Sequence, residues 1–228
     1  MERTVVINLQ INLNEDQPSP VKTPTVIEEP AMEGKQNPFG HIGLYHNRFL
    51  ESVEDRKDMD GNIDLIHAAA RDFFGKEFNL EIPEVKDLIF RAITVDPFEL
   101  VNQTKGFTAL SRTYLNHMLN CMYKPEFLSI HSVIKDLKKL EQKAIYDTSL
   151  TQEEEEVVYT TLSIAIHSLQ YWEDVEERRN VQALKPFWKK FWKVVGVAAA
   201  DVGAGALGSL VNPLVGGAAA GAASKAAS

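Results

Sequence analysis

A long apolar seam near residue 160 is the feature that most constrains how this chain can fold. Its positions follow one another at steps of four and three residues, which places them on one face of a helix. The seam comprises Val158, Leu162, Ala165, Leu169 and Trp172. Thr151 or Ser149 is suited to cap this helix, and the acids from Glu153 to Glu156 complement its positive N-terminal end. A heptad seam of this kind predicts a helix in a bundle.

The stretch from 38 to 180 reads as a succession of such helices. Each begins near a proline or a capping residue and carries apolar residues at helical spacing. Starts are expected at Pro38, Ile63, Pro83, Pro97 and Pro125, with an interruption at Gly106 and a continuation over 110–122. No second set of strands accompanies them in the sequence. We predict an all-α bundle, and we expect residues 40–180 to fold alone.

The first 37 residues have a different character. Ile7, Leu9, Ile11 and Leu13 alternate with polar residues, so 1–14 is predicted to be a strand-like arm. This strand would pair with another protein or with a second copy of the chain. If it has no partner, the arm is expected to be flexible. Residues 15–37 are rich in proline and are predicted to form a linker. Removing residues 1–36 is expected to change the stability of the bundle little.

The amino-acid composition limits which partners, cross-links and cellular locations are expected for this chain. The net charge of −8 disfavours a nucleic-acid partner, because an acidic surface repels phosphate. The single cysteine, Cys121, excludes an internal disulfide framework and suits a small buried position. The N-terminal sequence lacks the pattern of a secretory signal, so a cytoplasmic protein with conditional membrane association is expected, and export by a non-standard route stays open.

No catalytic or metal-binding motif stands out. The spacing of Asp58, Asp60, Asn62 and Asp64 resembles a calcium loop. Counted from Asp58, however, isoleucine and alanine occupy the positions that need a turn glycine and a closing glutamate. The histidines show no zinc spacing. We therefore expect a non-enzymatic protein without cofactor or metal, and a metal-dependent enzyme using His41 and His46 is the weakest alternative.

Residues 185–193 form a cationic-aromatic segment. On a helix, its aromatic residues fall on one arc and its lysines on the opposite arc. The aromatic residues are Phe187, Trp188, Phe191 and Trp192, and the lysines are Lys185, Lys189, Lys190 and Lys193. Aromatic rings suit the headgroup depth of a membrane and lysines suit anionic lipid, so this segment is the expected membrane contact. The alternative is docking on the bundle, with the lysines facing the acids between Glu173 and Glu177.

The tail, residues 194–228, is rich in glycine and alanine. Asp201 is the only charged residue from Val194 to Ser224, and Asn212-Pro213 divides the stretch into halves too short to span a bilayer alone. Small residues let helices approach closely, and the positions expected to do so are Gly203, Gly208, Gly217 and Gly221. The pattern predicts a helical hairpin, an interfacial insertion or spanning after self-association. A disordered low-complexity tail is the alternative.

Two short motifs carry a resemblance. Asn37-Pro38 followed by Gly43, His46-Asn47 and Leu50, and Ser163-Ile164-Ala165 followed by Ser168 and Tyr171-Trp172, are similar to motifs of small uncharacterised bacterial proteins with a glycine-rich tail. That resemblance covers about 37–221 and implies a bacterial origin and this architecture, but no activity. It also raises the expectation that His46, Asn47, Tyr171 and Trp172 meet in a polar patch. Ordinary buried packing with satisfied hydrogen bonds is the alternative.

These observations support one leading hypothesis. The chain is expected to be a non-enzymatic, membrane-associating helical protein whose partner is anionic lipid, and a pore-forming or toxin-like role is compatible with this layout. The alternative is a soluble interaction module whose N-terminal strand joins a partner's sheet and whose tail is disordered.

Overall fold

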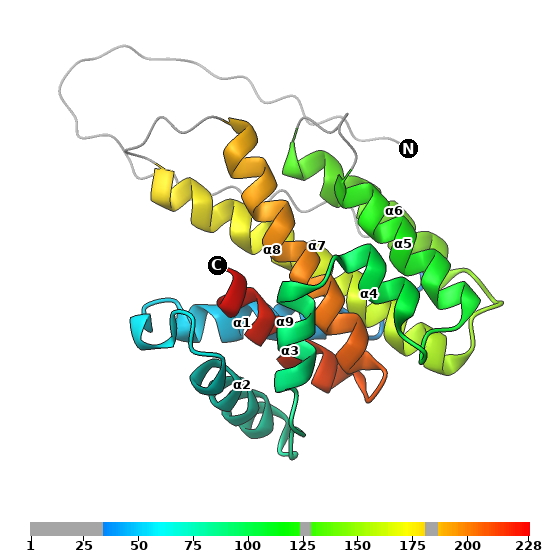
Figure 1. Cartoon of the computed structure of the whole chain (residues 1–228). Helices are drawn as coiled ribbons and strands as arrows, with labels where there is room; N and C mark the ends of the chain where they lie inside the picture. The colour runs from blue at the N-terminus through cyan, green and yellow to red at the C-terminus, as the bar shows by residue number, and fades with distance from the viewer. Residues whose placement is uncertain (1–33, 124–128, 181–186) are drawn as a thin grey trace, which may run out of the picture. The chain divides into compact units, whose positions relative to one another are not determined.

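The computed structural model describes residues 34–123, 129–180 and 187–228, and the side chains among them except at 179–190 (Figure 1). Residues 35–228 form one compact unit. The regular elements in the described part are all helical, as predicted, and comprise α1 (Gly40–Val53), η1 (Lys57–Met59), α2 (Ile63–Phe78), α3 (Lys86–Thr94), α4 (Pro97–Gln103), α5 (Ala109–Tyr123), α6 (Ile130–Ile145), α7 (Gln152–Asn180), α8 (Phe187–Ser209) and α9 (Pro213–Ala227). The strand-like arm, most of the linker, Pro125 and Lys185 lie outside the described residues.

Side-chain caps explain several helix starts. Asp96 accepts hydrogen bonds from the backbone N–H groups of Phe98 and Glu99 at the start of α4. At the start of α7, Thr151 Oγ1 accepts from the N–H of Glu154, and Glu154 Oε2 accepts from the N–H of Thr151 at 2.8 Å. This reciprocal pair is a capping box. Of the two expected caps, Thr151 is therefore the one used, while Ser149 bonds to Asp147.

The first helix begins later than its proline suggests. Pro38 and Phe39 form a turn, and α1 starts at Gly40. Asn37 Oδ1 accepts from the N–H of Phe39, the residue before the helix, so Asn37 does not cap α1 itself. Its amide nitrogen donates to Glu141 at 2.7 Å and to the carbonyl of Tyr159 at 2.9 Å. The proline therefore precedes the helix, and Asn37 instead joins the start of the body to α6 and α7.

The apolar seam lies in the core. Every seam residue of α7 from Val158 to Trp172 is buried, and α7 packs against α1, α5, α6, α8 and α9. Cys121 is also buried, as its apolar surroundings predicted. α7 is thus the helix around which the body is assembled.

The glycine/alanine tail does not stand apart from the bundle, and this corrects the boundary expected at residue 180. Of the expected arrangements it forms the helical hairpin, with α8 alongside α7 and α9 beside α1, α2 and α3 (Figure 1). Nearly every residue of the hairpin from Val194 onward is buried, apart from the turn at Leu210–Pro213 and the end of α9. α8 also runs without a break from the cationic-aromatic segment into the tail. The tail is therefore part of the core rather than a disordered appendage.

Close approach explains the glycines of this hairpin. A Cβ on Gly208 would lie 2.8 Å from the Cα of Gly216, so α8 and α9 meet backbone to backbone there. A Cβ on Gly217 would lie 2.9 Å from the ring of Phe74, and one on Gly221 would lie 2.7 Å from the ring of Phe49. Gly203 likewise faces Leu100. All four glycines expected to mediate helix association make their close contacts within this chain.

Candidate functional site

The cationic-aromatic segment is split between the surface and the core. Phe187, Trp188, Lys189 and Lys190 form the first residues of α8. Phe191 is buried at 1% exposure, whereas Trp192 next to it is 41% exposed. Of the two aromatic residues in this segment whose side chains are described, Trp192 is therefore the one placed to reach an external surface.

Neighbouring helices contact this end of α8. Trp192 stacks on Tyr123 of α5 with ring centroids 6.3 Å apart. Lys193 forms an ion pair with Glu176 of α7 at 3.0 Å, and that carboxylate is almost fully buried. For Lys193, the docked arrangement considered from the sequence is therefore the one observed. Phe191 is buried inside the body, so the expectation that it contacts a membrane is corrected. Lys193 is exposed and its membrane contact stays a prediction.

A fully buried polar cluster lies at the centre of the body. Asp201 of α8 accepts hydrogen bonds on Oδ2 from Ser168 of α7 and, at 2.8 Å, from Ser224 of α9. His46 of α1 places its Nε2 3.4 Å from the same oxygen. Ser224 in turn accepts from the indole N–H of Trp172 at 2.7 Å. Four helices thus converge on Asp201, the only charged residue from Val194 to Ser224.

The four residues expected to form a polar patch all lie around this cluster. His46 Nδ1 is 2.9 Å from Asn47 Oδ1, and Asn47 donates to the carbonyl of His167 at 3.0 Å. Tyr171 packs edge-on against Trp172, with ring centroids 5.2 Å apart. His46 and Trp172 do not bond to each other but are linked through Asp201 and Ser224.

This geometry does not suit catalysis. A serine, a histidine and an aspartate meet, but Ser168 donates to the carboxylate rather than to the imidazole, so no base is placed to activate it. His46, Ser168 and Asp201 are each fully buried, and none lines a cavity described for this structure. In the described part of the chain, these three side chains are therefore closed to solvent.

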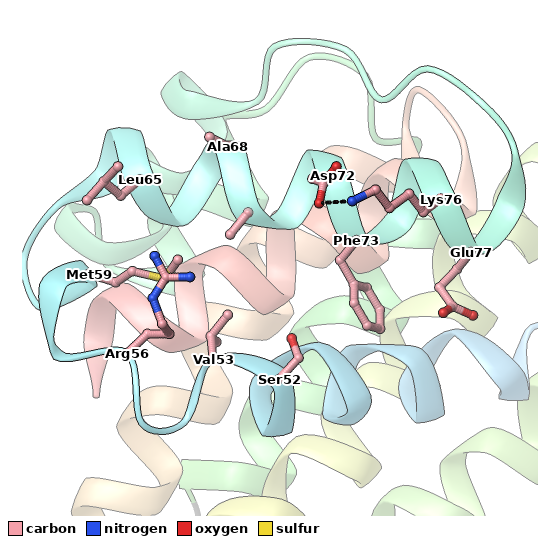
Figure 2. A pocket seen from close by; sticks show the side chains of 11 residues that line it. Ser52, Val53, Arg56, Met59, Leu65, Ala68, Asp72, Phe73, Lys76 and Glu77 are labelled. Carbon is pink, nitrogen blue, oxygen red and sulfur yellow. Dashed lines mark hydrogen bonds and ion pairs between the residues drawn. The ribbon is translucent and has the colours of Figure 1, made fainter.

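An open pocket of about 500 Å³ lies between the end of α1 and α2 (Figure 2). Val53, Met59 and Phe73 line its apolar part. Its charged groups are paired: Asp72 binds Lys76 at 2.7 Å, and Arg56 binds Asp58 at 2.7 Å. The lining includes neither histidine nor cysteine.

The acids of the rejected calcium loop are also engaged with other partners. Asp58 pairs with Arg56, Asp60 with Lys225 and Asp64 with Lys86, while Asn62 caps α2. Within the described ranges, no group of three or more histidine, cysteine, aspartate or glutamate side chains could hold a metal ion.

Two further histidines lie in the body, of which His67 is buried and His167 is partly buried. His67 Nε2 accepts a hydrogen bond from the N–H of Val85 at 3.2 Å, and burial lowers the pKa of His67 against the opposing effect of Glu84. Burial also lowers the pKa of His167, whose Nδ1 donates to the carbonyl of Ser163 at 2.8 Å. Both therefore favour the neutral form in the folded protein.

Sequence reasoning missed Ser168, Asp201 and Ser224 as members of the central cluster. Asp201 carried a usable signal, because a lone charge in a long apolar stretch must find partners when the stretch is buried. The serines carried none, since helices contain many serines without such a role. No known protein family, curated protein or solved structure matches this chain.

Proposed function

We propose that this protein is a non-enzymatic helical protein that docks on anionic membrane surfaces through the first turns of α8. The observation that carries the proposal is the position of Trp192. It is 41% exposed on a helix that begins Phe-Trp-Lys-Lys, while the same helix is mostly buried from Val194 onward. An exposed tryptophan beside lysines has the chemistry of the membrane interface.

Peripheral docking fits the chain better than insertion of the hairpin. Among the described helices, one stretch, Phe191–Ser209, is long and apolar enough to cross a membrane, but 83% of it is buried within the protein. α9 has 15 residues and extends only about 22 Å, against roughly 30 Å of hydrocarbon. Glycine and alanine add little hydrophobic drive, and leaving the bundle would uncover Phe49 and Phe74. The pore-forming role therefore has less support than surface docking.

The expected binding is weak and salt-sensitive. Each lysine near an anionic surface contributes about 1 kcal/mol. Lys193 binds Glu176. We therefore assign this attraction to the other two lysines in the sequence of α8, Lys189 and Lys190. Trp192 adds burial of an aromatic ring, which salt does not screen.

Co-sedimentation with vesicles tests the proposal. The wild-type protein should pellet with vesicles containing phosphatidylserine at low salt and much less with neutral phosphatidylcholine vesicles. Lys189→Gln/Lys190→Gln should lose most of the binding to anionic vesicles at low salt. Trp192→Ala should weaken binding at both low and high salt.

Two matched variants serve as controls. Lys138→Gln/Lys139→Gln removes another adjacent pair of lysines, on α6, and should bind as the wild type does. Tyr146→Ala removes an aromatic ring that is 57% exposed, just after α6, and should also leave binding intact. If the wild type ignores anionic vesicles, or if both lysine pairs matter equally, the docking proposal fails and the soluble interaction module takes its place.

A further inference from the structure

The hydrogen bonds around His46 fix where its protons lie. Asn47 donates from its amide nitrogen to the carbonyl of His167, which leaves its Oδ1 facing His46 Nδ1. A carbonyl oxygen only accepts, so Nδ1 must carry a hydrogen. In a singly protonated ring, Nε2 would then present a lone pair to Asp201 Oδ2 at 3.4 Å.

That arrangement would be repulsive, because Oδ2 is itself only an acceptor when ionised. Oδ2 already accepts the hydroxyl groups of Ser168 and Ser224, which suits a carboxylate. A hydrogen on the ring nitrogen that faces Oδ2 removes this repulsion. The geometry points to a doubly protonated imidazole paired with an ionised carboxylate, fully buried in the middle of the body.

The hairpin needs such a pair for a physical reason. Glycine and alanine give α8 and α9 smooth faces that could pack in neighbouring registers at similar energy. One buried charge that must meet its partner penalises every other register, and this is the best-attested use of buried polar groups. Asp201 is the only charged residue from Val194 to Ser224, and its partners come from α1, α7 and α9.

We propose that His46 and Asp201 form a charge clamp that sets the register of the α8–α9 hairpin in the bundle. His46 holds the charge from α1, and Ser168 and Ser224 orient the carboxylate from α7 and α9. The clamp does not involve lipid, so its test is independent of the test of membrane docking.

A double-mutant cycle on the full-length chain tests the clamp. His46→Leu leaves the Asp201 carboxylate without its positively charged partner. Asp201→Asn removes the negative charge but keeps an acceptor for the two serines. The double variant carries neither charge. The readout is amide hydrogen exchange in α9, with α6 as the internal reference. His46→Leu should raise exchange in α9 at least tenfold, and adding Asp201→Asn should reverse most of that rise. A merely structural role predicts instead that the double variant exchanges faster than either single variant.

Nitrogen NMR of the wild type gives a second, independent readout. His46 should show hydrogens on both ring nitrogens at pH 7, and His46→Leu should show doubled amide signals in α9 from alternative registers. A singly protonated His46, or a failure of Asp201→Asn to rescue His46→Leu, would overturn the clamp. If His46→Leu does not fold, folding of the double variant supports the clamp. The number of hydrogens on the ring nitrogens of His46 in the wild type then supports or overturns it.

Discussion

At the scale of single residues, the hairpin depends on the absence of side chains. Gly208 faces the backbone of α9, and backbone atoms cannot rotate away as a side-chain end can. Gly196 lies on the same helix but is exposed, with nothing within 4 Å of where its Cβ would lie. Among the glycines of α8, Gly208 is therefore required by close packing, whereas Gly196 is not.

Alanine substitutions should separate these two reasons. Gly208→Ala should lower the free energy of unfolding by roughly 1–3 kcal/mol, because the helices must move apart. Gly196→Ala should raise it by up to about 1 kcal/mol, because alanine favours a helix interior. Urea unfolding followed by circular dichroism measures both. Equal effects of the two substitutions would contradict the close packing of α8 on α9.

A pH effect is also expected from a single residue. Burial lowers the pKa of His67 below its ordinary value of 6.5, so the unfolded chain binds a proton more readily than the folded one. The resulting stability is complete above about pH 6.5 and is lost as the pH falls through the folded pKa.

Between pH 7 and pH 5, we expect the free energy of unfolding to fall less, or to rise more, in His67→Gln than in the wild type. Glutamine can still accept from the N–H of Val85 but does not titrate. His167 contributes with the same sign, so part of the slope should remain in the variant. Urea unfolding at several pH values measures the slope, and an unchanged slope in His67→Gln would exclude His67 as a cause.

At the scale of elements, the sequence predicted helices well but their surroundings poorly. Thr151 and the α7 seam could be recognised because caps and helical periodicity are local properties. The burial of the tail could not, because glycine and alanine occur alike in lipid, in disordered chains and between tightly packed helices. Asn37 shows the same limit, since its partners on α6 and α7 lie more than 100 residues away.

The capping box of α7 offers a test at this scale. Thr151→Ala should lower the free energy of unfolding by about 1 kcal/mol, because the N–H of Glu154 loses its acceptor. Ser149→Ala, two residues earlier, breaks only exposed bonds to Asp147 and should have a smaller effect. Thermal unfolding followed by circular dichroism can compare them. If Ser149→Ala lowered the free energy of unfolding more than Thr151→Ala, Thr151 would not be the cap of α7.

At the scale of the whole molecule, the helices before residue 180 do not make a complete core. α9 covers Phe49 and Phe74, and α8 supplies the hydrophobic surface that packs on α7. A chain ending at 180 would leave this surface exposed to water. The caps and periodicity of the sequence predicted that residues 40–180 fold alone, whereas this packing leads us to expect that they do not.

Two truncations should therefore behave differently. The fragment 35–180 should be helical without a cooperative thermal transition and should bind a hydrophobic dye. The fragment 35–228, which keeps the whole compact unit, should melt within about 5 °C of the full chain, a shift worth roughly 1–2 kcal/mol at this size. Circular dichroism and dye fluorescence distinguish the outcomes, and a sharp transition in 35–180 would show that the hairpin is dispensable.

Because α9 packs against the first helices, part of their apolar surface stays uncovered until the end of the chain is synthesised. Lys225 of α9 lies 165 residues after its partner Asp60. A ribosome adding about 5–20 residues per second needs roughly 8–33 s to make that interval. Throughout that time Phe49 and Phe74 lack the helix that covers them, so the nascent chain presents a hydrophobic surface to which chaperones can bind.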